Sequence, residues 1–407
     1  MLFASCIFAG WGRAALPDAE PERIGGNSRK PVVEGPSEAM ALFKRARVLN
    51  SEKDYEGAEK LYKQALATDP KCAPALFGYA NLLRAERKDY DGAEELLARA
   101  IAADPTFVPA LNSYGSLLAD HRKDYDAAEK LYRQALDANP TFTPALNNYA
   151  LLLTNHRKDL DKAEELYKRA IELDPKGSIA LNNYANLLWG HRKDHEGAER
   201  LYRRALDAGP QNADALQSYG GFLMDRGDYV NAEKLMRRAI AMDPEGAWCH
   251  GCLAILLERT GTADEEADAS FRKAVELDGA DPLLRGNYAH FLLGRGRRPE
   301  GLAALDEAFE RFVPDADKDG QANCWFYAYC FRPQPDQGQA LARLKALLVT
   351  ANARAEGWDL SRVVSQAVKD SHPDAAWLHR LAEVINGKAK PLDLDGWPAW
   401  AAIELDE

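Results

Sequence analysis

The chain has 407 residues, of which 46% are apolar and 28% are charged, a balance typical of a folded globular protein. This composition excludes a fibrous or wholly disordered chain. Its 52 Lys and Arg against 63 Asp and Glu give a net charge of −11. Because nucleic-acid affinity rests on basic side chains that displace counterions, we expect no nucleic-acid partner.

The N-terminal residues 1–36 contain scattered Pro and Gly and are expected to form a flexible leader. Their apolar start, MLFASCIFAGWGR, lacks the basic residues and the longer apolar run of an export signal, so we expect a cytoplasmic protein, with export as the alternative. The sequence has no run of 18 apolar residues, so no membrane span is predicted. Its 6 cysteines are too few for a disulfide scaffold.

The middle of the chain repeats itself. Prolines recur at intervals of 35 residues and once of 34: Pro70, Pro105, Pro140, Pro175, Pro210 and Pro244. The amino-acid sequence around these prolines recurs as well, and eight units cover about residues 37–313. A repeat of this length indicates one supersecondary unit that buries its apolar face against its neighbours.

Each unit is predicted to hold two helices separated by a polar turn. In the fourth unit, apolar residues follow the helical period in two runs: Leu146, Tyr149, Ala150 and Leu153, then Ala163, Leu166, Tyr167, Ala170 and Ile171. Asp159 or Asp161 is placed to cap the second helix, and Pro175 ends it. Small residues such as Ala150 and Ala163 recur in every unit, so we expect them where helices approach closely.

This arrangement resembles the tetratricopeptide repeat signature, in which large, small and aromatic residues are followed by Ala, an aromatic residue, Ala and Pro. Leu replaces the family's frequent Trp, and five units are expected to carry one extra residue between their helices, as at Arg157 and Lys158. The resemblance implies an all-α, right-handed α-solenoid of about eight repeats. It also implies a non-catalytic scaffold that holds a protein or peptide partner against an inner surface lined by first helices.

Carried over by position, the resemblance places on this inner surface Phe77, Asn81, Arg84, Asn112, Ser116, Asn147, Leu151, Asn155, Asn182, Asn186, Trp189, Gln217, Met224 and Asp225. The predicted peptide-binding residues among them are Phe77, Asn81, Asn112, Asn147, Asn182, Asn186, Trp189 and Gln217. Asn amides offer both donors and acceptors to an extended backbone, as in the asparagine ladder of some family members. Phe77 and Trp189 would anchor apolar side chains. The alternative is that the Asn residues are solvated or pack between units. A clamp for acidic chaperone tails is disfavoured, because Arg84 is the only basic residue among the inner positions.

Two other interpretations of the repeats remain as alternatives. Pentatricopeptide repeats also have a period of 35 residues and bind RNA, but the acidic charge disfavours them. Basic pairs in the turns would form a stripe able to meet an anionic partner, unless the following Asp residues neutralise it. The stripe comprises Arg87, Lys88, Arg122, Lys123, Arg157, Lys158, Arg192 and Lys193, and a His precedes three of these pairs.

We searched the sequence for catalytic and metal-binding motifs and predict neither an enzyme nor a cofactor. Cys249 and Cys252 are spaced as a CxxC pair, but no second pair follows at zinc-site spacing, so we favour packing within a helix over a metal or redox role. Residues 315–320 resemble the start of a calcium loop, but Phe326 stands where the bidentate Glu is required. A polar turn is the favoured interpretation there.

Residues 314–407 lack the repeat but hold five of the eight Trp. Helices are predicted at about 320–331, 337–354, 359–370 and 373–387. Because the last unit of a solenoid exposes an apolar face, we interpret this region as a helical C-terminal cap. The alternatives are self-association through Trp397 and Trp400, or a regulatory or enzymatic activity in 315–407 for which the repeats provide targeting.

Overall fold

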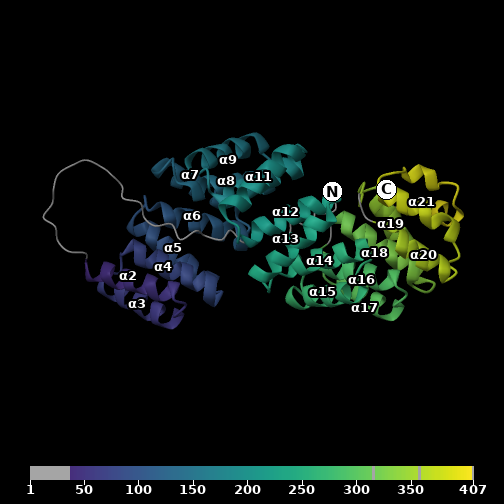
Figure 1. Ribbon diagram of the computed structural model, residues 1–407, viewed down its shortest axis with the longest axis horizontal. Helices are drawn as coiled ribbons and strands as arrows, with labels where there is room; N and C mark the ends of the chain where they lie inside the picture. The colour runs from purple at the N-terminus through teal and green to yellow at the C-terminus, as the bar shows by residue number, and fades with distance from the viewer. Residues whose placement is uncertain (1–36, 314–316, 356–358, 406–407) are drawn as a thin grey trace. The chain divides into compact units, whose positions relative to one another are not determined.

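The computed structural model describes residues 37–313, 317–355 and 359–405, and every regular element among them is a helix (Figure 1). The leader expected at 1–36 lies outside the described residues. The chain divides into two compact units, an N-terminal unit ending at Ala208 and a C-terminal unit beginning at Gly209, each described by itself below. The predicted all-α fold of repeated helix pairs is confirmed. Within the described residues, no helix is both long and apolar enough to cross a membrane.

The N-terminal unit consists of five helix pairs. They are α2 (Glu38–Ser51) with α3 (Tyr55–Thr68), α4 (Ala73–Leu82) with α5 (Tyr90–Ala103), α6 (Val108–Leu117) with α7 (Tyr125–Ala138), α8 (Thr143–Leu152) with α9 (Leu160–Leu173), and α10 (Ser178–Leu187) with α11 (His195–Ala208). An Asp caps the second helix of each pair; at α9, the carboxylate of Asp159 accepts from the backbone N–H of Lys162 at 3.3 Å. Of the two candidate caps, Asp159 therefore fills this role.

The extra residue in the turns is accommodated by one π-helical turn at the end of each first helix. These turns are η1 (Leu83–Arg87), η2 (Leu118–Arg122), η3 (Leu153–Arg157) and η4 (Leu188–Arg192), and each is followed by a Lys with φ between 56° and 59°. The sequence analysis predicted five units with an extra residue, but the described residues contain four. In the first pair the Asp54 N–H donates to Leu49, five residues back, whereas Asp89 reaches six residues back to Leu83.

Small residues lie where the helices of a pair touch, as predicted. Ala128 and Ala163 are fully buried in α7 and α9. At Gly115 of α6, an added Cβ would lie 2.8 Å from Cε1 of Tyr132 in α7, closer than carbon atoms can approach. A larger residue at any of these points would force the two helices apart.

The first helices form the inner layer of the N-terminal unit. Helix α2 contacts α4, α6 contacts α8 and α8 contacts α10, whereas successive second helices approach one another less closely. Each second helix also packs on the first helix of the next pair. We call the layer formed by α2, α4, α6, α8 and α10 the inner layer of this unit.

The C-terminal unit continues the pattern with four further pairs. They are α12 (Ala213–Asp225) with α13 (Tyr229–Met242), α14 (Ala247–Thr260) with α15 (Asp264–Leu277), α16 (Pro282–Gly294) with α17 (Arg298–Phe309), and α18 (Lys318–Phe331) with α19 (Asp336–Val349). The pair α18–α19 packs on α16 and α17 as a further repeat would. The sequence analysis counted no repeat there, because this pair lacks the Ala and Pro positions that mark the others.

The last elements of the chain return to pack on the C-terminal unit. They are α20 (Ser361–Lys369), α21 (Ala375–Ile385), η5 (Pro391–Leu394) and α22 (Pro398–Ala401). Helix α20 contacts α16 and α18, the inner layer of this unit, and lies beside them in Figure 1. Trp397 is fully buried, and its indole donates to Asp374 at 3.0 Å, while the Tyr329 hydroxyl donates to the same carboxylate at 2.6 Å. The compact units thus divide at 208/209. The expected boundary at 313/314, between the repeats and a C-terminal cap, stays a prediction.

Candidate functional site

The predicted inner-surface residues lie on first helices, but most of them are buried. Asn112, Asn147, Asn182 and Asn186 are each no more than 5% exposed, and Trp189, in η4, is buried as well. A second group of predicted inner residues is half-buried: Phe77, Asn81 and Gln217. Gln217 belongs to the C-terminal unit, where its side-chain oxygen faces Cys249 Sγ at 3.1 Å.

Amide side chains form hydrogen bonds between successive repeats. Asn148 Nδ2 donates to Asn112 Oδ1 and to Ser116 Oγ, both at 3.1 Å, and Asn183 Nδ2 donates to Asn147 Oδ1 at 3.0 Å. The oxygens of Asn112 and Asn147 thus already serve the repeat that follows. Asn112 and Asn147 thus pack between repeats, which was the alternative to peptide binding for these residues.

The sequence analysis missed the donors, Asn148 and Asn183. Each is the second Asn of an Asn-Asn-Tyr motif that recurs at the repeat interval, and this recurrence was a signal that could have found them. One helical step rotates a side chain by about 100°, so the second Asn points toward the preceding repeat.

Other polar atoms along the same first helices are buried and have no hydrogen-bond partner among the described residues. They are Asn81 Oδ1, Arg84 Nε, Asn155 Oδ1, Asn182 Oδ1 and Asn186 Nδ2. A buried polar atom without a partner costs about 1–3 kcal/mol, so such atoms are rare in a closed core. In the N-terminal unit such atoms lie mainly on the layer of first helices.

One carboxyl group on the inner layer has a strongly shifted pKa. Burial raises the pKa of Asp120 to about 6, and the nearby charges of Arg84 and Lys123 oppose the shift. The inner layer thus carries Arg84 beside a titratable carboxyl. The sequence analysis named Arg84 but not Asp120.

The arginines of the predicted basic stripe are paired with the preceding repeat. Arg157 contacts Glu129 at 3.0 Å and also reaches Asp126, and Arg122 and Arg192 repeat this pattern with acids 28 and 31 residues earlier. Arg87 contacts Glu59 at 3.2 Å. The Asp residues that follow the basic pairs cap helices instead. In the part of the chain that the structure describes, the lysines of the stripe have no acidic partner: Lys88, Lys123, Lys158 and Lys193.

The same acids also bind the signature tyrosines. The Tyr149 hydroxyl donates to Glu129 at 2.9 Å, so one Glu holds both the Tyr and the Arg of the next repeat. Two histidines of the turns, His121 and His156, stack on Tyr90 and Tyr125, which begin second helices, with 3.7 Å and 3.8 Å between the ring centroids. The polar residues of the turns thus join repeats.

The two candidate metal motifs do not form sites among the described residues, where no group of three or more His, Cys, Asp or Glu is placed to hold an ion. Cys249 and Cys252 share one face of α14 and are both buried, and burial raises the pKa of the Cys249 thiol to about 12. Asp317 caps α18 by accepting from the Gly320 N–H at 3.4 Å. Asp315 lies outside the described residues.

Comparisons with known proteins agree with the repeat pattern. Family models described as tetratricopeptide repeat match residues 49–119, 114–178, 155–213, 184–247 and 223–282, which together exceed half of the chain. A segment of 85 residues is 32% identical to the type IV pilus assembly protein PilF of Pseudomonas aeruginosa. This match covers 21% of the chain and only 33% of that relative.

Solved structures with a similar arrangement include two bacterial proteins. A tetratricopeptide repeat protein from Parabacteroides merdae aligns with a TM-score of 0.48 at 17% identity, covering 61% of this chain and 97% of that one. The structure of Pseudomonas aeruginosa PilF aligns with a TM-score of 0.43 at 21% identity, covering 51% of this chain and 92% of that one.

Proposed function

Because this chain belongs to the tetratricopeptide repeat family of protein-interaction scaffolds, we propose that it binds an extended segment of a partner protein on the first helices of its N-terminal unit. We further propose that it does so without catalysis and without a cofactor. A cytoplasmic location and self-association through the C-terminal region stay predictions.

The observation that supports this proposal is the set of unpartnered polar atoms on the first helices. The oxygens of Asn81, Asn155 and Asn182 accept hydrogen bonds, and an extended backbone supplies N–H donors at regular intervals. Binding would satisfy groups that folding leaves unsatisfied, which makes the inner layer complementary to a peptide main chain. Phe77 lies on the same layer and is half-buried, so it would contact an apolar side chain of that peptide, whereas Trp189 is buried within the unit.

The asparagines of the predicted ladder thus fall into two groups with different roles. Asn112 and Asn147 join repeats, so their removal should act mainly on stability. Asn182 and Asn186 retain unpartnered atoms, so they remain candidates for direct contact. The proposed site is therefore Phe77, Asn81, Asn155, Asn182 and Asn186, without the buried Trp189 of the predicted set.

The experiment compares two sets of substitutions in the full chain. The first set is Asn81→Ala with Asn155→Ala and Asn182→Ala, and the matched control is Asn112→Ala with Asn147→Ala. Binding is measured against an immobilised library of random 15-residue peptides, and each variant is also melted. We expect the first set to lose peptide binding with little change in melting temperature, and the control set to melt earlier.

Retention of the same peptides by the first set at unchanged affinity would contradict the proposed groove. Loss of binding only in the control set would contradict it too, because the oxygens of Asn81, Asn155 and Asn182 would then not be needed for binding. The competing hypothesis is an activity within 315–407, where the carboxylate of Asp374 is already engaged by Tyr329 and Trp397.

A further inference from the structure

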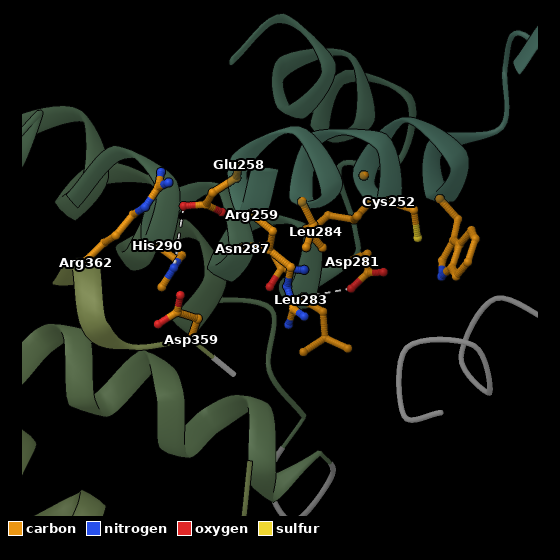
Figure 2. A pocket seen from close by; sticks show the side chains of 13 residues that line it. Cys252, Glu258, Arg259, Asp281, Leu283, Leu284, Asn287, His290, Asp359 and Arg362 are labelled. Atoms are coloured by element: carbon orange, nitrogen blue, oxygen red, sulfur yellow. Dashed lines mark hydrogen bonds and ion pairs between the residues drawn. The ribbon is translucent and has the colours of Figure 1, made fainter. Parts of the chain in front are cut away.

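In the C-terminal unit the inner layer is partly occupied by the chain itself. Helix α20 packs on α16 and α18, and the Cβ of Arg362 in α20 lies close to the backbone of Gly294 at the end of α16. The inner face of α14 and the start of α16 are not covered in this way. A pocket of about 60 Å³ remains between these two helices and the beginning of α20 (Figure 2).

One part of the pocket wall is apolar. Trp248 and Ile255 of α14 and Leu283 and Leu284 of α16 contribute it. Gly251 lets Leu284 approach α14 closely, because a Cβ at Gly251 would lie 2.8 Å from Leu284 Cδ2. The size of the pocket suits a single side chain and excludes a docked helix, which has a diameter of about 10–12 Å.

The charges on the remaining wall balance one another. Glu258 is paired with Arg295 at 3.2 Å. Two further carboxylates, Asp281 and Asp359, share the wall with two guanidinium groups, Arg259 and Arg362. An ion of either sign would gain little there, because each attractive charge has an opposite charge nearby.

The buried imidazole at the charged end is also engaged within the protein. His290 Nδ1 lies 3.1 Å from the Tyr327 hydroxyl. Figure 2 shows His290, Asp359 and Arg362 grouped at one end of the pocket and Cys252 and Asp281 at the other. The two ends of the pocket thus carry different side chains, while the charges of the pocket wall sum to about zero.

Asn287 lies between these two ends (Figure 2). Its side chain is 4% exposed, and its Oδ1 has no hydrogen-bond partner among the described residues. A buried amide oxygen requires a donor to offset the cost of its desolvation. A ligand that fits this pocket should therefore place an N–H next to its apolar part.

We propose that this pocket binds one apolar side chain of a partner peptide, with Asn287 Oδ1 accepting from the main-chain N–H of the same residue. The side chain would contact Trp248, Ile255 and Leu284. The ligand class is a peptide with an uncharged aliphatic or aromatic anchor. This inference rests on the proposed peptide-binding function and adds a second site, in the C-terminal unit, with its own selectivity.

The test uses capped amino acids as minimal ligands for the full-length protein. N-acetyl amides of Leu, Phe, Gly, Lys and Glu are titrated separately, while NMR follows the Trp248 indole and the Asn287 side-chain amide. The Trp248 signal is assigned with Trp248→Phe. We expect saturable shifts of both signals with the Leu or Phe amide, and none with the Gly, Lys or Glu amide at the same concentrations.

A pair of variants separates the pocket from general effects on the fold. Ile255→Ser removes part of the apolar wall, and Val230→Ser makes the same kind of change at a site that is 66% exposed and outside the pocket. We expect Ile255→Ser to weaken the Leu amide about tenfold, which corresponds to about 1.4 kcal/mol, and Val230→Ser to leave it unchanged.

The amide of N-acetyl-N-methyl-Leu tests the hydrogen bond to Asn287 Oδ1. It keeps the Leu side chain but lacks the main-chain N–H that would donate this bond, so we expect it to bind more weakly. Shifts with only the Lys or only the Glu amide, or no shift with any amide, would overturn the proposal. Either result leaves the peptide library experiment unaffected, because that experiment reports on the first helices of the N-terminal unit.

Discussion

The two units share one way of joining repeats but differ in what their inner layers offer. In the N-terminal unit Glu164 accepts from Tyr184 at 3.0 Å and pairs with Arg192, and in the C-terminal unit Asp268 accepts from Tyr288 at 2.9 Å and pairs with Arg297. The inner layer of the first unit carries amides with unpartnered atoms. The second covers part of its inner layer with α20 and leaves a pocket beside it. The contacts that hold repeats together can thus persist while the binding surface changes.

The largest effect on stability is expected from replacing Trp397, which lies among the last elements of the C-terminal unit. Its ring stacks on Trp377 and Trp400 at centroid distances of 5.9 and 6.3 Å. Trp397→Ala should cost about 3–5 kcal/mol by leaving a cavity and an unpaired Asp374. Hydrogen exchange should rise in 318–401 more than in 37–208, while the control Leu392→Ala, at an exposed site, should change neither. Uniform exchange across both ranges would contradict this local role.

A smaller effect is expected from overpacking one repeat of the N-terminal unit. Ala163 is fully buried in α9, so Ala163→Phe should cost about 1–3 kcal/mol and lower the melting temperature by several degrees. Ala102→Phe places the same ring at an exposed position of α5 and should leave the melting curve unchanged. Equal melting temperatures for the two variants would argue against close helix packing at Ala163.

The acid that joins two repeats should give a pH-dependent contribution. Burial acts to raise the pKa of Glu164, but hydrogen bonds from Lys168 and Tyr184 outweigh it and hold the pKa below the ordinary 4.5. The stabilisation is therefore present above pH 4.5 and is lost as the pH falls through the lower pKa of the folded state. Glu164→Gln should reduce the free energy of unfolding by about 1 kcal/mol at neutral pH.

The difference in melting temperature between wild type and Glu164→Gln should shrink as the pH approaches 3. Glu165→Gln, at the next and exposed position, provides the control and should show no difference at any pH. If the melting temperature of Glu164→Gln stays below that of wild type by the same amount at pH 3, the loss of stability would come from the shape of the side chain and not from its charge.

The smallest effect concerns the histidines of the turns, which occur in the N-terminal unit alone. Burial, together with the charges of Lys123 and Lys158, lowers the pKa of His156. The unfolded chain then binds a proton at a higher pH than the folded chain, so protonation weakens the fold as the pH falls below about 6.5. NMR titration should give a midpoint below 6.5 in the native protein and near 6.5 in concentrated urea. A native midpoint above 6.5 would contradict burial of this ring.

The sequence by itself determined the helix pairs and their order. The Pro interval, the helical spacing of Leu146, Tyr149 and Ala150, and the small residues at Ala128 and Ala163 are local patterns, and neither helix of a pair can bury its face alone. These features were sufficient to predict an all-α stack. The resemblance to tetratricopeptide repeats, carried by the same positions, is what implied an inner surface on the first helices.

Only the tertiary structure decided which inner residues remain open to a ligand. Asn147 and Asn182 occupy equivalent positions, yet the Asn147 oxygen accepts from Asn183 while that of Asn182 is unpartnered. The partners of Arg157 lie 28 and 31 residues away, and α20 covers helices that precede it by more than 30 residues. Such pairings depend on how repeats stack in space, and a periodic pattern assigns the same role to every copy. The pocket beside Asn287 therefore became visible only once α14, α16 and α20 were brought together.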